Sequence, residues 1–433
     1  MEDKRTRTIQ TVLIAVLMTV IVGLIVAAAF LTARVYITNR SISAVLEETG
    51  ALPEFNDDLV DLVDSCFATY YYTELPEREV LAQQTLAAYD EFCRGKINET
   101  DSDEVTLAVI DCYIYAIGDS YAFYRTPTET DDFYTDMSGS FVGIGVSVLS
   151  DTLEGTITVD SVEPDSPAQK AGVLPGDLIV AVDGTRIEDV GVEALIDLVR
   201  GEVGTEVTVT VRRGETEISL TAVREQITET TVALSYLEDG SIAYIRIKGF
   251  KSNTAAQFID AIQKVEASEA KAIIFDLCGN PGGSLDTTVQ MLSYLVPDGT
   301  RIASFSAFLG PIDASSGESS EYEKTDHVLN LPVAVTVNRY SASASELFTQ
   351  ALKDYTEMGI LDAAVLGEVT YKKGVMQSTI PFTNGGTLTL TTALYNPPSG
   401  NNFNGVGVMP DIPVAEGEDV TAAAIAYLKT KIN

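Results

Sequence analysis

The spacing of hydrophobic and polar residues divides this chain of 433 residues into regions, beginning with a long apolar run. Residues 12–31 contain 20 consecutive uncharged positions, which as a helix would span about 30 Å, the thickness of a bilayer core. Lys4, Arg5 and Arg7 precede the run, and such residues favour the cytoplasmic side. We therefore expect a transmembrane anchor at residues 11–33, with the short N-terminus in the cytoplasm and the rest of the chain outside the cell membrane.

A cleaved signal peptide is the alternative to this anchor. Ala27, Ala28 and Ala29 supply the small residues that a signal peptidase prefers. The apolar run is longer than the core of a typical signal peptide, which favours an anchor that is retained.

Helical periodicity follows the apolar run. Apolar residues recur at helical spacing within residues 59–63 and 105–110, and residues 101–104 read Asp-Ser-Asp-Glu, a helix start. A helical region able to pair two copies into a homodimer is predicted over residues 34–130.

The next region has the sequence pattern of a small β domain. Strands rich in Val and Ile alternate with glycine turns, and we expect them at residues 141–148, 156–162, 177–182, 206–212 and 217–223. One short helix is expected after Pro167 and another over residues 192–200.

The remaining residues alternate between strand and helix patterns. Strands are expected at residues 241–247, 271–277 and 332–337, and helices at 254–265, 285–295 and 344–353. The strands are apolar throughout instead of alternating, which predicts an α/β core with a partly parallel sheet.

These patterns predict five parts. They are a cytoplasmic segment (1–10), an anchor (11–33), a helical region (34–130), a β-rich domain with two helices (131–226) and an α/β core (227–433).

Composition narrows the classes of function. Hydrophobic residues make up 45% of the chain, so most of it should fold. The formal net charge is −35, and no long basic patch exists to neutralise phosphates, which argues against nucleic-acid binding.

The single histidine, His327, limits the catalytic chemistry. A zinc site of the His-Glu-x-x-His kind needs two histidines, and a Ser-His-Asp triad would have to use this residue, which lies in a polar stretch typical of a loop. No Cys-x-x-Cys spacing occurs either. We expect no metal and no other cofactor, and lysine is then the base that best suits a catalytic serine.

Three of the four cysteines lie in the helical region. Any pair among Cys66, Cys93 and Cys112 is able to form a disulfide outside the membrane. Buried free thiols are the alternative.

A candidate nucleophile lies in the run Ser-Ala-Ser-Ala-Ser-Glu at residues 341–346. Ser343 falls between an expected strand and an expected helix, where a side chain is exposed and the next N–H can stabilise an oxyanion. Spacing alone leaves Ser341 and Ser345 as alternatives, and a capped helix packed tightly on the sheet would also explain the run.

A candidate base lies in the segment Lys-Gly-Val-Met-Gln at residues 373–377. Lysine accepts a proton only when neutral, and burial away from anions lowers its pKa from the usual value of about 10.4. The amide of Gln377 can accept a hydrogen bond from the neutral amine without adding charge. The residues themselves leave Lys372 and Lys373 as equal candidates.

A glycine-rich turn, Gly-Asn-Pro-Gly-Gly at residues 279–283, follows a buried strand. Glycines let the backbone approach a ligand and direct N–H groups at it. A phosphate-binding loop would end in Gly-Lys-Ser/Thr, which this turn lacks.

Residues 139–146 and 166–177 resemble a PDZ domain, although a β domain with ordinary glycine turns is the alternative. PDZ domains add the C-terminus of a peptide as a strand to a sheet edge and hold its carboxylate on successive N–H groups. The resemblance implies that this loop consists of Val142, Gly143, Ile144 and Gly145.

Residues 50–415 as a whole resemble the carboxy-terminal processing peptidases, or tail-specific proteases. The matching motifs occur in the family's order, at residues 118–124, 139–146, 166–177, 276–283, 338–346, 374–377 and 391–400, with Gly407, Pro410 and Asp411. The resemblance implies a crotonase/ClpP-like α/β protease core with an inserted PDZ domain.

The resemblance also implies roles for individual residues. The nucleophile corresponds to Ser343, the base to Lys373 and the assisting amide to Gln377, and the oxyanion hole uses the N–H of Ala344 and one from Gly282 or Gly283.

The chain departs from the family pattern at three places. Cys278 stands where the family usually has Arg, Lys372 stands where it usually has Gly, and the link around residues 356–359 is longer. None of these departures removes a catalytic atom.

The expected function is that of a membrane-anchored serine endopeptidase that acts on proteins with exposed C-terminal tails. The PDZ domain would capture the tail, and a Ser-Lys dyad would form an acyl-enzyme. A catalytically inactive PDZ scaffold that tethers partners at the membrane is the alternative, and acyl-CoA chemistry on a related α/β fold is a third, which the PDZ domain disfavours.

Overall fold

The computed structural model describes residues 41–151, 155–307, 310–315 and 327–432. The chain forms two compact units. The first comprises the residues up to Thr130 with Phe305–Ile312 and Val375–Tyr395, and the second comprises Asp131–Ser304, Asp313–Gly374 and the residues from Asn396 onward. Within the described ranges no helix is long and apolar enough to cross a membrane. The predicted anchor at residues 11–33 lies outside those ranges.

Helices make up most of the N-terminal part of the first unit. They are α2 (Ile42–Glu48), α3 (Asp57–Tyr70), α4 (Arg78–Phe92) and α5 (Ser102–Ile117). The side chains of Ser41, Asn56 and Asp101 accept hydrogen bonds from first-turn N–H groups of α2, α3 and α5. These caps explain where the three helices begin.

A sheet completes the first unit, and its strands are far apart in sequence. They are β1 (Phe123–Arg125), β13 (Arg301–Ala307), β14 (Gly310–Ser315), β17 (Val375–Pro381) and β18 (Thr387–Asn396), in the order β1-β18-β13-β14 with β17 also paired to β18. Leu388 and Leu390 of β18 share a buried cluster with Phe67 and Tyr113 of the helices. This strand therefore packs with the N-terminal helices, although its position in the sequence suggests the α/β core.

The helical region also brings two cysteines together. Cys93 Sγ, at the end of α4, lies 3.7 Å from Cys112 Sγ in α5. Both are free thiols, as are Cys66 and Cys278. Of the pairs that the sequence leaves open, this one has its sulfur atoms in contact.

The second unit begins with helix α6 (Pro127–Ser138), whose first residues belong to the first unit, and continues into the β-rich domain. Its strands are β2 (Ser140–Gly143), β3 (Val146–Asp151), β4 (Thr156–Val162), β5 (Leu178–Val182), β6 (Thr185–Arg186), β7 (Glu206–Arg213), β8 (Thr216–Val223) and β9 (Glu225–Thr228). Its helices are α7 (Pro167–Ala171), α8 (Ile187–Val190) and α9 (Val192–Val199). The main sheet has the order β3-β4-β5-β7-β8, and β2 pairs separately with β9.

Residues 141–148, which the sequence predicts as one strand, are divided between two strands, β2 and β3. The chain turns at Gly145, whose φ is +80° and whose position leaves no room for a side chain, since a Cβ atom would lie 2.4 Å from Ser166 Cβ. The turn separates β2 from β3, because left-handed backbone cannot continue a strand.

The α/β core is built on a six-stranded sheet. In order, the strands are β10 (Val232–Leu237), β11 (Ile242–Ile247), β12 (Ala272–Asp276), β15 (Val333–Val337), β16 (Ala363–Gly367) and β19 (Ile412–Pro413). Strand β10 is antiparallel to β11, and the other pairs are parallel. The partly parallel sheet predicted from the sequence is confirmed.

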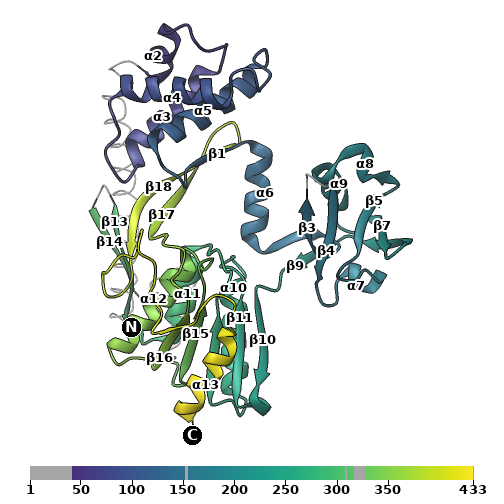
Figure 1. Cartoon of the computed structure of the whole chain (residues 1–433), viewed down its shortest axis with the longest axis vertical. Coiled ribbons are helices and arrows are strands. Elements are labelled where there is room, and N and C mark those ends of the chain that lie inside the picture. The colour runs from purple at the N-terminus through teal and green to yellow at the C-terminus, as the bar shows by residue number, and fades with distance from the viewer. Residues whose placement is uncertain (1–40, 152–154, 308–309, 316–326, 433) are drawn as a thin grey trace, which may run out of the picture. The chain divides into compact units, whose positions relative to one another are not determined.

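Helices cover both faces of this sheet (Figure 1). Alternate residues of β12 divide between the faces: Phe275 packs in one cluster with α10 (Thr254–Glu266), α11 (Leu285–Leu295) and α12 (Ala344–Glu357). Ile274 packs in the other cluster with α13 (Val420–Ile432). Burial on two faces explains why these strands are apolar throughout.

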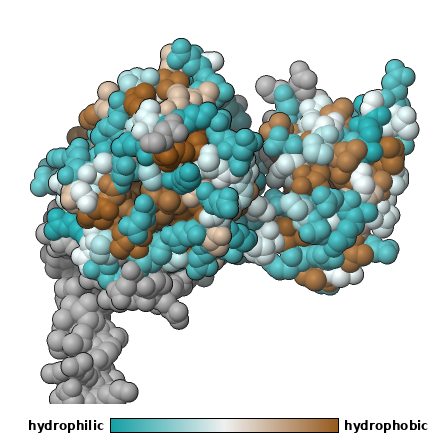
Figure 2. Space-filling model, turned by 90° about the horizontal axis from the view of Figure 1, so that it is seen from below, coloured by the Kyte–Doolittle hydropathy of each residue, from teal (hydrophilic) through white to brown (hydrophobic). Residues whose placement is uncertain are grey.

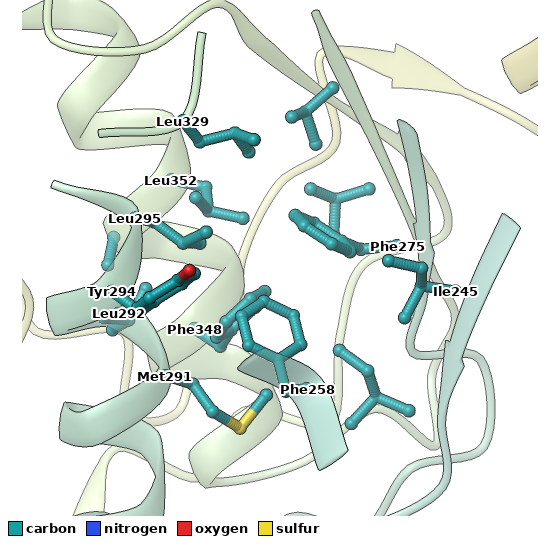
Figure 3. Packing of buried hydrophobic residues seen from close by; sticks show 14 of the residues in the cluster. Ile245, Phe258, Phe275, Met291, Leu292, Tyr294, Leu295, Leu329, Phe348 and Leu352 are labelled. Atoms are coloured by element: carbon teal, nitrogen blue, oxygen red, sulfur yellow. The ribbon is translucent and has the colours of Figure 1, made fainter. Parts of the chain in front are cut away.

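An aromatic cluster holds α12 against the sheet (Figure 3). The ring of Phe348 lies edge-on to Phe258 and Phe275, with centroid distances of 5.9 and 5.7 Å. The three rings and Phe250 are fully buried. Edge-to-face packing of this kind fixes the helix in position and, with it, the turn from which it starts.

Hydrophobic residues also reach the surface. Figure 2 shows them scattered among hydrophilic residues over the face in view, which is ordinary for a folded protein.

Candidate active site

Ser343 lies between β15 and α12 in a backbone conformation that side chains disfavour. Its φ is 57° and its ψ is −114°, and a non-glycine residue in such a region costs about 1–3 kcal/mol. The same sharp strand-to-helix turn presents the nucleophile of α/β-hydrolases. Ser343 is partly exposed, as a nucleophile must be.

The two competing serines are fully buried and have structural partners. Ser341 Oγ donates to the carbonyl of Leu277 (2.8 Å) and accepts from the N–H of Asn338 (3.0 Å). Ser345 Oγ donates to the carbonyl of Asn280 at 3.0 Å. These hydroxyls join the serine turn to the glycine-rich turn, and Ser343 is the member of the run whose side chain reaches solvent.

The glycine-rich turn packs directly against the serine turn. A Cβ atom on Gly282 would lie 2.6 Å from the carbonyl oxygen of Ala342 and 3.0 Å from Ser343 Cβ. One on Gly283 would lie 2.4 Å from the carbonyl oxygen of Phe250. Both glycines have positive φ, +100° and +143°, so close approach and backbone geometry each require glycine here.

The backbone donors near Ser343 are not equivalent. The N–H of Gly282 donates to Asn280 Oδ1 at 2.8 Å. The N–H groups of Gly283 and Ala344 have no acceptor in the part of the chain that the structure describes. Of the two glycines that the family resemblance offers for an oxyanion hole, Gly283 is therefore the one with an unengaged donor.

The two lysines that the residues left as equal candidates differ in their surroundings. Lys372 is exposed, whereas Lys373 is partly buried. Lys372 has a φ of 84°, which explains why the family usually has glycine at this position.

The site also contains a carboxylate that is not among the residues predicted from the sequence. Glu346, in the first turn of α12, is 0% exposed. Its Oε2 accepts from the N–H groups of Ser343 and Lys373, each at 2.8 Å. The backbones of the two candidate catalytic residues are thus joined by one oxygen atom.

A sequence signal for Glu346 does exist. Its position, three residues after Ser343, is that of the acid in a capping box, and the structure contains that box. The pattern predicts a contact with Ser343, but no pattern predicts the second contact, with a residue 27 positions away.

Gln377 belongs to the first compact unit and is described with it. Its Nε2 lies 3.4 Å from Thr391 Oγ1, and Thr391 Oγ1 donates to Asp119 Oδ1 at 2.9 Å. The side chain follows a β-bulge between Met376 and Gln377 in β17. Bulges commonly redirect side chains near active sites.

Two other groups are unsuited to nucleophilic catalysis at this turn. The ring of His327 stacks on Tyr294 with a centroid distance of 4.1 Å, and its nitrogens bond Glu266 Oε1 and the carbonyl of Tyr294. Burial, assisted by nearby Asp276, raises the pKa of the Cys278 thiol to about 12. Cys278 is therefore protonated at neutral pH and is a poor nucleophile.

A second candidate site is a cavity of about 450 Å³ in the PDZ region. The loop Val142, Gly143, Ile144 and Gly145 lines it, together with Leu195 and Val199 of α9. The carbonyls of Ile144 and Gly145 accept from the N–H groups of Ala168 (2.8 Å) and Glu163 (2.9 Å). Within the described ranges the N–H groups of Ile144 and Gly145 have no acceptor.

Comparison with known proteins identifies the families that these two regions resemble. Residues 241–414 match the model of peptidase family S41, and residues 158–213 match a PDZ domain. A "Probable CtpA-like serine protease" of Staphylococcus aureus (strain COL) is 34% identical over 319 residues, which cover 72% of this chain and 61% of that protein. One from Staphylococcus epidermidis (strain ATCC 12228 / FDA PCI 1200) is 32% identical over 332 residues, covering 76% and 64%.

This chain therefore spans less than two thirds of the length of these relatives. Among solved structures, one named as an S41 protease from Bacteroides fragilis NCTC 9343 has the same fold, with a TM-score of 0.51 and 14% identity over 86% of this chain and 92% of that one. The chain contains a domain of peptidase family S41 over residues 241–414 and a PDZ domain over residues 158–213.

Proposed function

We propose that the chain is a serine endopeptidase that cleaves proteins at or near their C-terminal tails, with Ser343 as nucleophile and Lys373 as base. The observation that carries the proposal is the strained, partly exposed turn at Ser343, where the two competing serines are buried. Strain of this kind persists where surroundings hold it, and it is concentrated at active sites.

The proposed reaction needs only groups of this chain, the peptide and water. The neutral amine of Lys373 takes the Ser343 hydroxyl proton while Oγ bonds to the carbonyl carbon of the scissile peptide. The N–H groups of Ala344 and Gly283 hold the oxyanion. The carbon–nitrogen bond then breaks and the ammonium returns the proton to the leaving amine.

Water completes the reaction by attacking the acyl-enzyme. The amine of Lys373 takes a proton from that water and returns it to Ser343 Oγ as the carboxylic product leaves. Gln377 is proposed to orient the amine by accepting a hydrogen bond from it, as the family resemblance implies.

The PDZ cavity is proposed to capture the substrate's C-terminus. Its apolar lining residues, among them Leu195 and Val199, suit an apolar terminal side chain, and the unengaged N–H groups of Ile144 and Gly145 suit a carboxylate. Because the substrate enters as an added strand, its affinity depends on main-chain bonds and on the terminal group.

The membrane anchor remains part of the proposal. The uncharged run at residues 12–31 after Lys4, Arg5 and Arg7 supports a single-pass protein with its protease domain outside the membrane. Carbonate extraction of membranes would leave the full chain in the pellet and release a chain that lacks residues 1–33.

The same shortened chain, examined by analytical ultracentrifugation, tests whether the helical region at residues 34–130 pairs two copies into a homodimer.

Cleavage of an unstructured tail peptide tests the proposed dyad. Ser343→Ala and Lys373→Ala are expected to lose at least about 1,000-fold in kcat and to keep their thermal transitions, since removal of one member of a nucleophile–base pair removes the activated nucleophile. The matched controls are Ser345→Ala and Lys372→Ala, which should retain turnover. Full cleavage by either dyad variant would reject the assignment, and peptide binding without cleavage by the wild type would favour a scaffold.

A further inference from the structure

Glu346 places an unusual demand on the fold, because a fully buried carboxylate must have all its acceptor sites filled. Oε1 accepts from Thr370 Oγ1 (2.6 Å) and from the N–H of Lys372 (2.7 Å). Oε2 accepts from the N–H groups of Ser343 and Lys373, each at 2.8 Å. Each oxygen of the carboxylate therefore accepts two hydrogen bonds.

An ordinary helix cap would not need this arrangement. A capping-box acid bonds the N–H of the residue that begins its own helix, as Glu346 does with Ser343. The other three donors come from residues 370–373, which lie in a separate segment leading to the lysine. The carboxylate therefore fastens a distant segment to the start of α12.

Backbone strain gives a second, independent observation. Six non-glycine residues in the described part of the chain have positive φ. Two of them are Ser343 (57°) and Lys372 (84°), and both donate their N–H to Glu346. The same side chain thus stabilises both strained positions, one at the nucleophile and one directly before the base.

The segment is also held from its other side. Thr370, which is 2% exposed, donates its hydroxyl to Glu346 and accepts from the N–H of Val408 at 2.7 Å. A bond from the Gly405 N–H to the Lys372 carbonyl, at 2.9 Å, continues this support. Thr370 and Lys372 are therefore bonded to residues 405–408 as well as to Glu346.

We propose that Glu346 is a positioning residue for the dyad: its carboxylate sets the spacing between Ser343 and Lys373 by bonding both backbones through one oxygen. It acts through the backbone and takes no proton during the reaction. This inference rests on the proposed function, because it assigns a role relative to those two residues.

The test is Glu346→Gln, which keeps the shape of the side chain. It replaces one carboxylate oxygen, which accepts two hydrogen bonds, with an NH₂ group that accepts none. The expected result is a kcat about 100-fold lower, since displacements near 1 Å at a reacting pair have such effects. KM for the tail peptide should change less than about 3-fold, because the variant does not alter the PDZ cavity. The rate at which a fluorophosphonate labels Ser343 should fall in parallel with kcat.

Thr370→Val is the matched control. It removes one donor from the same carboxylate but leaves the bonds to Ser343 and Lys373 in place. It should lower the melting temperature while keeping kcat within about 5-fold of wild type. A merely structural role for Glu346 predicts instead that both variants lower the melting temperature and that folded Glu346→Gln retains the wild-type kcat, which would overturn the inference.

A shorter acid covers the case in which Glu346→Gln does not fold. Glu346→Asp retains the charge but lacks one methylene, so its carboxylate cannot reach both segments, and the expected result is a folded protein with the same loss of kcat. Wild-type kcat in this variant would contradict the inference. If the wild type itself neither cleaves nor labels at Ser343, the proposed function fails instead, so the two failures are distinguishable.

Discussion

The residue before the proposed base has a backbone conformation that does not suit its side chain. Lys372 has φ = 84° and an exposed side chain, and left-handed backbone costs a non-glycine residue about 1–2 kcal/mol. Two hydrogen bonds hold it in this conformation: its N–H donates to Glu346, and its carbonyl accepts from the N–H of Gly405. Local strain next to the proposed dyad is thus balanced by hydrogen bonds within the same site.

Lys372→Gly is therefore expected to stabilise the protein by about 0.5–1 kcal/mol. The relief of left-handed strain exceeds the entropy that an added glycine gives the unfolded chain. Tyr371→Gly, at an exposed neighbour with ordinary φ, should destabilise the protein. Thermal unfolding measures both, and a loss of stability in Lys372→Gly equal to that of Tyr371→Gly would contradict this account.

Single residues show what the sequence reveals about the site and what it does not. Ser343 and Lys373 were predictable as candidates because their motifs are local. Spacing could not separate Ser343 from Ser341 and Ser345, since the distinction is burial, which tertiary packing decides. Glu346 was missed for the same reason: three of its four donors come from a segment more than 20 residues away.

At the scale of elements, a buried carboxylate also holds a loop in the PDZ region. Asp177, directly before β5, is 1% exposed. It accepts from Arg213 Nε and Nη2, each at 2.7 Å, and from the N–H of Leu174 at 2.9 Å. The hydrogen bonds from Arg213, together with that from Leu174, lower the pKa of Asp177 below its usual value. The carboxylate joins β5, β7 and the loop between α7 and β5.

This arrangement predicts a pH dependence of stability. Because the folded-state pKa is below the unfolded value of about 3.9, the stabilising contribution is complete above that value and is lost as the pH falls through the folded pKa. Asp177→Asn should therefore be less stable than wild type at pH 7, and the difference should shrink below about pH 4. Calorimetry of the full chain at pH 7 and pH 3 measures it, and a difference independent of pH would contradict the assignment.

Elements with strong periodicity follow from the sequence with small shifts of their ends. The helix at residues 285–295 and the strand at 156–162 have the predicted bounds. The strand predicted at 141–148 is divided because the left-handed turn at Gly145 outweighs its β propensity. The pairing of β18 with β1 and β13 was not predictable, because it joins segments at least 80 residues apart.

At the scale of the whole molecule, the proposed activity depends on two sites in one chain. The PDZ cavity would recognise the end of a substrate, and Ser343 would cleave it. The fold class and the family could be inferred from several motifs in a consistent order. The substrate cannot be inferred from the sequence, since the cavity is lined by residues from several distant segments, among them the loop at 142–145 and α9.

Blocking the substrate's C-terminal carboxylate should weaken its capture by the PDZ cavity without altering the proposed cleavage site at Ser343. A tail peptide with a C-terminal amide is expected to have a kcat/KM at least about 10-fold below that of the free acid, because the N–H groups of Ile144 and Gly145 lose their charged acceptor. The rate of fluorophosphonate labelling at Ser343, measured without peptide, provides the reference for an intact active site. Equal cleavage of the amide and the acid would argue against carboxylate capture by the PDZ loop.

Covalent labelling of the intact protein tests the central claim most directly. A fluorophosphonate or β-lactone probe, followed by peptide mass spectrometry, should place a single adduct on Ser343. The adduct should be absent in Ser343→Ala, form at a normal rate in Lys372→Ala, and form at least about 100-fold more slowly in Lys373→Ala. An adduct on Ser341 or Ser345, or labelling of Ser343 that is unaffected by loss of Lys373, would contradict the Ser343–Lys373 dyad.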